Sequence, residues 1–145
     1  MLHKPTKVTL AANAFKRMGN LKFLIVHNVH ICNELKYLPN GLRFLDLPNY
    51  PFPLPSNFCP QKLATLNMPC SHKCESITKL PNLCTPNLEN LDLSFCKNLV
   101  ECHESIGFLD KLQKLCLFSC KKLQNPKPSH VEISRHFGYF ILLKS

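Results

Sequence analysis

Glycine is scarce in this sequence, with four residues among 145, whereas proline occurs twelve times. This ratio is unusual for a mixed α/β enzyme, and the nine prolines between positions 39 and 86 exclude long helices through the middle of the chain. No segment reaches the roughly 18 uncharged apolar residues that a membrane helix requires. We therefore expect a soluble, intracellular protein of one domain, or part of one, without a membrane-bound segment.

Motifs that carry catalysis are also missing. The sequence contains no Gly-x-Ser-x-Gly elbow, no His-Glu-x-x-His helix and no paired carboxylates. Cys102, His103 and Glu104 follow one another, but adjacent side chains point apart and do not form a nucleophile with its base and an orienting group. We expect surface or helix-start residues there, and we predict a protein that is not an enzyme and has no catalytic residue, cofactor or bound metal.

Acidic residues are few, nine against eighteen lysines and arginines, which gives a formal net charge of +9. Such an excess can indicate a polyanionic partner. The cations are spread along the chain, however, and no basic run is interleaved with aromatic residues that would stack on bases. We therefore expect no nucleic-acid partner, although a small nucleic-acid-binding protein stays an alternative.

Nine cysteines are scattered through the chain and do not frame short loops, which favours a reduced intracellular setting over a disulfide scaffold. Cys70, His72 and Cys74 lie close together, with Cys59 and Cys84 nearby, and soft ligands at such spacing can enclose zinc. A second tight ligand pair, which structural zinc sites normally have, is missing. The cluster nevertheless leaves a small zinc-binding protein as the other alternative.

Internal repeats are the strongest pattern in the chain. Two copies of Leu-x-x-Leu-x-Leu-x-x-Cys-x-x-Leu begin at Leu88 and Leu112, 24 residues apart. Looser copies begin at Leu21, Leu42 and Leu63, and a broken one begins at Phe137. Successive copies start 21, 21, 25, 24 and 25 residues apart, within the roughly 20 to 29 residues of a leucine-rich repeat.

This spacing predicts an α/β fold of the leucine-rich-repeat solenoid type, with a short parallel β-sheet on the concave face and an irregular or short-helical convex side. In an extended segment alternate side chains share a face, so the second and third apolar residues of each copy point inward and stack into one core. Cys96 and Cys120, where the chain turns out of the strand, are expected to pack inward as small buried thiols. A helical bundle would need the long helices that proline excludes.

The predicted organisation has three parts. Residues 1–20 form a junction with a short helix over 11–18, 21–125 hold the repeats, and 126–145 form a frayed tail with a partial repeat over 137–142. A second short helix is expected over 104–109. The strands are expected near 21–26, 42–47, 63–68, 88–93 and 112–117.

The positions between the inward leucines are expected to face solvent on the concave wall, which is the candidate protein-binding surface. Large aromatics at positions that the core does not need are typical of protein interfaces, but packing within the stack could also hide them. The candidate residues are Phe23, Ile25, His27, Phe44, Asp46, Thr65, Asn67, Asn90, Asp92, Ser94, Lys114, Cys116 and Phe118.

Three stretches of the chain follow an order known from one protein family. Residues 14–24 look like a junction into a first repeat, and Leu-Pro-Asn-Gly-Leu-Arg-Phe-Leu at 38–45, followed by 50–51 and 54–58, is similar to early repeats. Cys-Lys-Asn-Leu-Val-Glu at 96–101, His-Glu-Ser-Ile-Gly at 103–107 and Leu-Asp-Lys-Leu at 109–112 resemble a later repeat. Together they resemble the repeat region of plant intracellular immune receptors of the Toll/interleukin-receptor, nucleotide-binding, leucine-rich-repeat class.

The resemblance implies a role in plant defence and signal transduction. In that family a signalling enzyme domain and an ATP/ADP switch precede the repeats, which sense a pathogen signal and restrain the switch. This sequence has no Gly-x-x-x-x-Gly-Lys-Ser/Thr phosphate loop, so we expect a truncated product that acts as a non-catalytic recognition or autoinhibition module. The implied partners are proteins, namely a pathogen effector, a guarded host protein or the receptor's own nucleotide-binding region, in the cytoplasm or the nucleus.

Overall fold

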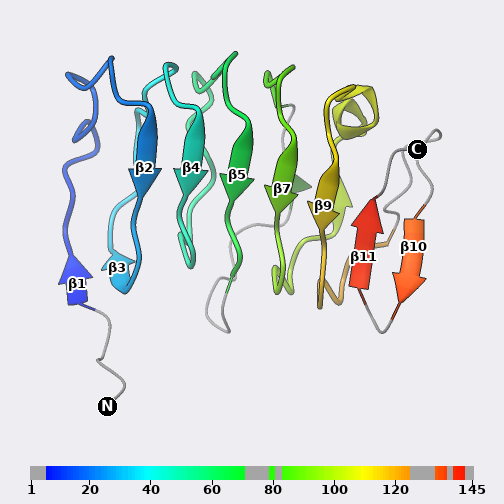
Figure 1. Ribbon diagram of the computed structural model, residues 1–145. Helices are drawn as coiled ribbons and strands as arrows, with labels where there is room; N and C mark the ends of the chain where they lie inside the picture. Colours follow the sequence, from blue (N-terminus) through cyan, green and yellow to red (C-terminus); the bar gives the residue numbers. More distant parts are fainter. Residues whose placement is uncertain (1–5, 71–78, 81–82, 125–132, 137–138, 143–145) are drawn as a thin grey trace.

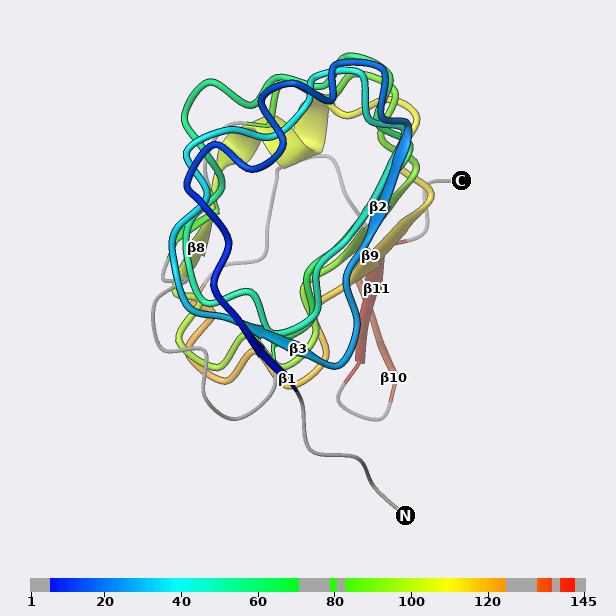
Figure 2. The ribbon, with the colours of Figure 1, turned by 90° about the vertical axis from the view of Figure 1, so that its left-hand side faces the viewer.

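The chain coils into a solenoid in which each turn places one short strand on the same side (Figures 1 and 2). The structure is a computed structural model that describes residues 6–70, 79–80, 83–124, 133–136 and 139–142. Five strands pair in parallel and in register, as the leucine pattern predicts, which confirms the leucine-rich-repeat solenoid. They are β2 (Phe23–Ile25), β4 (Phe44–Asp46), β5 (Thr65–Asn67), β7 (Asn90–Asp92) and β9 (Lys114–Cys116).

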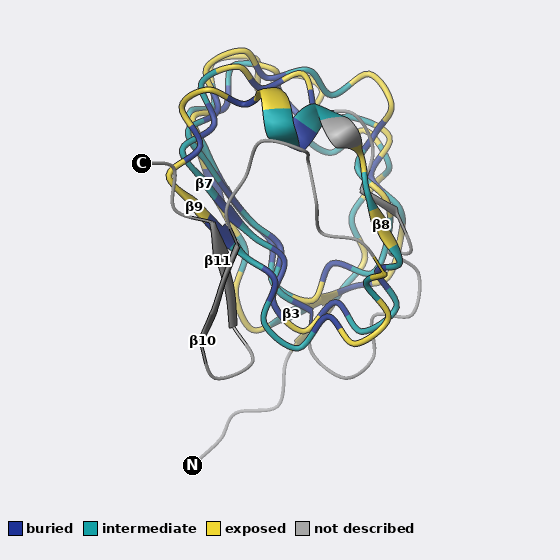
Figure 3. Ribbon diagram, turned by 90° about the vertical axis from the view of Figure 1, so that its right-hand side faces the viewer, coloured by how far each residue is buried: buried dark blue, intermediate teal, exposed yellow. Residues whose placement is uncertain are grey.

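Leucines stacked between the turns form the core. The central residue of each of these five strands is a leucine with at most 9% of its surface exposed, and the ladder aligns Leu45 with Leu66 and Leu66 with Leu91. Figure 3 shows buried residues recurring at matching positions of successive turns. Because burying one leucine contributes about 1.5–3 kcal/mol, this column supplies the main driving force that holds the turns together.

The sheet has seven strands, and its last two do not continue the parallel series. Strands β10 (Ile133–His136) and β11 (Tyr139–Leu142) form an antiparallel hairpin, and β11 pairs antiparallel with β9 through Ile141 and Cys116. The first two residues of the partial repeat expected over 137–142 lie outside the described residues. The rest of it belongs to β11, which runs opposite to the repeat strands.

The other side of the coil is almost entirely irregular. It carries two short parallel pairs, β1 (Thr6–Val8) with β3 (Val29–Ile31) and β6 (Lys79–Leu80) with β8 (Glu101–Cys102). The helix expected over 104–109 is present as a 3-10 helix, η1 (Glu104–Phe108). No described helix is long and apolar enough to cross a membrane.

The helix expected over 11–18 is wrong. This segment makes successive turns, in which Ala14, Lys16 and Met18 each donate a backbone N–H to the carbonyl three residues earlier, at 2.9–3.0 Å. So short a segment gains little from helix propagation, because fixing the first turn is costly. The packing of residues 11–18 along the solenoid therefore outweighs the weak helix preference of this segment.

Two buried thiols close the turns after β7 and β9, as predicted. The Sγ of Cys96 donates to the Met68 carbonyl at 3.6 Å, and the Sγ of Cys120 donates to the Leu93 carbonyl at 3.1 Å. Each thiol thus reaches a carbonyl of the preceding turn. Cysteine here both fills a small apolar space and satisfies a buried acceptor.

Candidate binding surface on the strand face

The candidate surface is the face of the sheet that points away from the leucine core, which we call the strand face. Its side chains form rows across the strands, because the parallel register aligns one residue of each strand with the next. The first row, in strand order, is Phe23, Phe44, Thr65, Asn90 and Lys114. A second row lies two residues further along each strand and holds Ile25, Asp46, Asn67, Asp92 and Cys116. The other three predicted residues, His27, Ser94 and Phe118, each lie two residues beyond a strand end.

The first part of the strand face is apolar. Phe23 and Ile25 on β2 expose 63% and 57% of their surface, whereas Phe44 on β4 is half-buried. The Phe23 and Phe44 rings lie 6.4 Å apart and tilted by 36°. Phe23 is thus an exposed aromatic, and Phe44 supports it from the neighbouring strand.

The middle of the strand face is polar and held by short-range hydrogen bonds. The Nε2 of His27 and the Oδ2 of Asp46 lie 2.7 Å apart, which joins the end of β2 to β4. Asn90 Nδ2 donates to Thr65 Oγ1 at 3.4 Å across β5 and β7. These polar groups are oriented by the sheet, so they offer fixed directions to a partner.

Ser94 does not belong to the accessible surface, although the sequence places it among the candidates. Its exposed fraction is 8%, and its backbone N–H donates to Asp92 Oδ1 at 2.9 Å. The side chain of Asp92 therefore bends the chain out of the strand. That turn draws Ser94 inward.

The last part of the strand face combines a cation with aromatic rings. Lys114 is exposed, while Cys116 and Phe118 are half-buried. Burial raises the pKa of the Cys116 thiol, the Asp92 carboxylate raises it further and Lys114 lowers it. Cys116 thus lies within electrostatic reach of both charges and stays a neutral thiol near pH 7.

Phe95 is a member of this surface that sequence reasoning missed. It is 40% exposed, and its ring packs edge-on against Phe118 with the centroids 5.0 Å apart. Its backbone φ is 63°, in the left-handed region, which is unfavourable for a bulky residue. Phe95 and Ser119 occupy the same position in two copies of the repeat, two residues after Leu93 and Leu117, and both have a positive φ. The repeat alignment therefore places Phe95 in the turn after the strand, which was the available signal for its exposure.

The adjacent Cys102, His103 and Glu104 lie where the 3-10 helix η1 begins. His103 caps the 3-10 helix, its Nδ1 accepting the backbone N–H of Ser105 at 3.1 Å, which is the helix-start role that the sequence predicts. Burial, and then the Glu101 carboxylate, raise the pKa of Cys102 to about 11. A thiol that stays protonated is a weak nucleophile.

The cysteines of the zinc alternative separate into two places. Cys70 is buried with its Sγ 3.1 Å from that of Cys96, while a hydrogen bond with Cys59 raises the pKa of Cys84. His72 and Cys74 lie outside the described residues. Among the residues that are described, no group of three or more His, Cys, Asp or Glu side chains is arranged to hold a metal ion.

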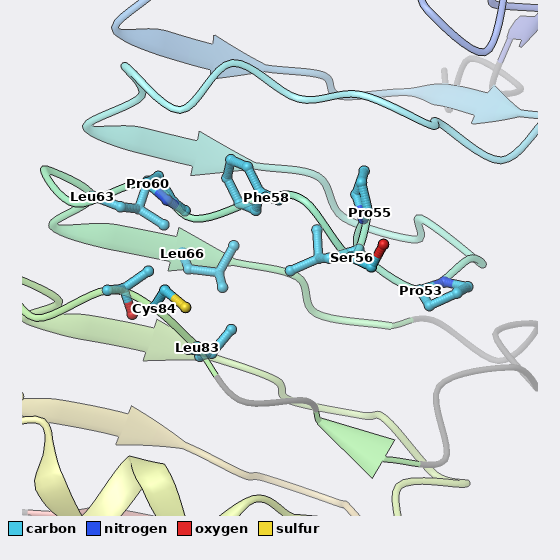
Figure 4. Close-up of a pocket in the computed structure, with 11 residues that line it drawn as sticks. Pro53, Pro55, Ser56, Phe58, Pro60, Leu63, Leu66, Leu83 and Cys84 are labelled. Atoms are coloured by element: carbon cyan, nitrogen blue, oxygen red, sulfur yellow. The ribbon is translucent and has the colours of Figure 1, made fainter.

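An apolar cavity of about 220 Å³ lies between the proline-rich segment and β5 (Figure 4). Prolines 53, 55 and 60, with Phe58, form one wall, and Leu66 and Leu83 face them. The wall also includes Thr85, which is 2% exposed and whose Oγ1 has no hydrogen-bond partner in the described structure. Packing in this turn is therefore looser than in the leucine column.

Comparison with known proteins finds related sequences. The chain is 32% identical to the disease resistance protein RML1B and 35% identical to the disease resistance protein TAO1, both of Arabidopsis thaliana, over 79% and 80% of its length. It is 29% identical to the TMV resistance protein N of Nicotiana glutinosa over 86% of its length. The chain spans 14%, 10% and 13% of these relatives.

Other comparisons find no match. No family model matches the chain. No solved structure matches it significantly.

Proposed function

The chain belongs to the plant disease resistance proteins of the Toll/interleukin-receptor, nucleotide-binding, leucine-rich-repeat class, and from this premise we propose that its strand face binds a protein without catalysis. The observation that carries the proposal is the joint exposure of Phe23 and Ile25 on a strand whose neighbours hold oriented polar groups. Exposed aromatics beside fixed hydrogen-bonding groups are typical of protein interfaces.

The proposed partner is a protein of the defence pathway in the cytoplasm or the nucleus. A pathogen effector, a guarded host protein and the nucleotide-binding region of a receptor of this class are the three candidates. The last of these would make the chain a restraining module. It is also the candidate that can be tested without first identifying a pathogen.

The test is co-purification of the full chain with the nucleotide-binding region of a relative, after co-expression in leaf cells. The informative variant combines Phe23→Ala with Lys114→Glu, which alter the two ends of the strand face. We expect the amount of partner retained to fall at least about tenfold, because truncating an interface hot spot costs about 2 kcal/mol or more and a tenfold loss requires only about 1.4 kcal/mol.

The matched control combines Phe108→Ala with Lys121→Glu, an exposed phenylalanine and an exposed lysine outside the strands. The control should retain as much partner as the unaltered chain. Equal retention by both variants would contradict the strand face as the binding surface. Failure of the unaltered chain to retain this region would exclude it as the partner.

A further inference from the structure

Strand β2 forms one edge of the seven-stranded sheet. In the strand order it follows β4 at the end of the sheet, with no further described strand beyond it. Figure 2 views the solenoid from this end and shows β2 with no strand in front of it. The edge therefore presents backbone groups that a further strand could pair with.

The hydrogen bonds to β4 identify which groups are free. Lys22 O accepts from Arg43 N and Phe44 N at 2.8 and 3.1 Å, and Val26 N donates to Asp46 O at 3.0 Å. In a parallel ladder alternate residues bond to the same neighbour, so Lys22, Leu24 and Val26 face β4. The N–H and C=O groups of Phe23 and Ile25 therefore point outward, within the described part of the chain.

The opposite edge of the sheet shows that it accepts an added strand. There β11 pairs antiparallel with β9, although β2 to β9 in the sheet are all parallel. The edge of a repeat strand thus pairs with a segment that is not itself a repeat. By the same geometry the β2 edge can take an added antiparallel strand.

Charge around this edge favours an acidic occupant. Between residues 6 and 46 the chain carries six lysines and arginines and two acids, Glu34 and Asp46, so that segment has a net charge of +4. The carboxylate of Glu34 is already paired with Lys36 at 2.6 Å. A second copy of the chain would bring like charges together at such an edge, whereas an acidic segment would be attracted.

We propose that the β2 edge binds an extended segment of a partner protein, with a short apolar strand flanked by acidic residues. Its backbone pairs with Phe23 and Ile25, and its apolar side chains on the same face contact those two exposed residues. The acidic flanks interact with the surrounding cations. This site shares Phe23 and Ile25 with the strand face of the proposed function, but it adds pairing through their backbone groups, which can be tested separately from side-chain recognition.

The probe is a nine-residue peptide, Glu-Asp-Val-Thr-Val-Thr-Val-Asp-Glu, added to the full chain. We expect amide hydrogen exchange at Phe23 and Ile25 to slow at least about tenfold at saturation, and the affinity to fall as salt rises. The same peptide with lysine at its four acidic positions should bind at least about tenfold more weakly. Unchanged exchange at both amides would overturn the proposal.

Two N-methylated forms of the peptide separate backbone pairing from side-chain contact. Methyl groups on alternate residues block either the edge that faces β2 or the opposite edge, while the side chains stay the same. One form should lose binding at least about tenfold and the other should keep it, because only one edge donates to β2. Equal affinities of the two forms would overturn the proposal.

Two further measurements complete the test. The Ile25→Pro variant removes an N–H that does not bond to β4, so the chain should fold and lose peptide affinity at least about tenfold, whereas Lys121→Glu, an exposed position outside the strands, should keep it. A folded Ile25→Pro chain with full affinity would overturn the proposal. The exchange at Phe23 and Ile25 is also measured without peptide at a series of protein concentrations. If it slows as the concentration rises, the edge binds a second copy of the chain, and this result would also overturn the proposal.

Discussion

Buried thiols at the turns show how single residues serve this fold. Burial raises the pKa of Cys120 to about 12, and a hydrogen bond with the Cys96 backbone only partly offsets this effect. Its Sγ nevertheless donates to the Leu93 carbonyl, so the protonated form is the one that the folded chain uses. The same side chain therefore links stability to pH.

We predict that the free energy of unfolding falls as pH rises from about 8.5 to 10.5. The thiol titrates near 8.5 in the unfolded chain, so the unfolded state loses its proton first while the folded state keeps it. The stabilisation is complete below the unfolded pKa and is lost toward the folded one, at up to about 1.4 kcal/mol per pH unit. Urea denaturation at a series of pH values measures this slope.

Cys120→Ser is the control for this slope. The variant is expected to be less stable at every pH, but its stability should depend less steeply on pH because the hydroxyl does not titrate in this range. A slope equal to that of the unaltered chain would show that other groups, not Cys120, cause the pH dependence.

At the scale of elements, the segments between strands are held by close backbone approach as well as by side chains. Gly41 lies just before β4, and a Cβ atom there would lie 2.8 Å from the carbonyl oxygen of Gly19. That oxygen belongs to the backbone of the preceding turn and cannot move aside easily. Two turns thus meet where only glycine fits.

We predict that Gly41→Ala lowers the free energy of unfolding by about 1–3 kcal/mol, the usual cost of forcing extra atoms into a packed site. Gly19→Ala is the matched control, because nothing lies within 4 Å of its added Cβ. It should change stability by less than about 0.5 kcal/mol. Chemical denaturation of both variants measures the difference, and similar losses would argue against the close contact.

At the scale of the whole molecule, the two edges of the sheet differ. The β9 edge is covered by β11, whereas the β2 edge is open in the described structure. Uncovered edge strands promote association between chains. The hairpin at the end of the solenoid therefore has a protective role that the repeat pattern alone does not indicate.

We predict that a chain ending at Gln124, without β10 and β11, self-associates more than the full chain. Removing the hairpin exposes the β9 edge, whose side chains include the half-buried Cys116. Light scattering after size-exclusion chromatography at matched concentrations measures the effect. A shortened chain that stays monomeric wherever the full chain is monomeric would contradict a protective role of the hairpin.

The sequence by itself determined the solenoid and the positions of its strands. A local pattern suffices for this, because a Leu-x-x-Leu-x-Leu segment can bury its leucines only as a strand stacked on an equivalent strand. Thus β7 and β9 lie within the clean copies that begin at Leu88 and Leu112. The inward thiols of Cys96 and Cys120 were predictable for the same reason.

Only the tertiary structure decided which strand-face residues are accessible and where the sheet ends. Phe23 and Phe44 occupy the same repeat position, yet β2 has a strand on one side and β4 has strands on both, so Phe23 is exposed and Phe44 is half-buried. The antiparallel β11 likewise escaped the repeat pattern. Exposure and edge pairing depend on what stacks alongside a strand, and a repeat that looks the same in every copy does not contain that information.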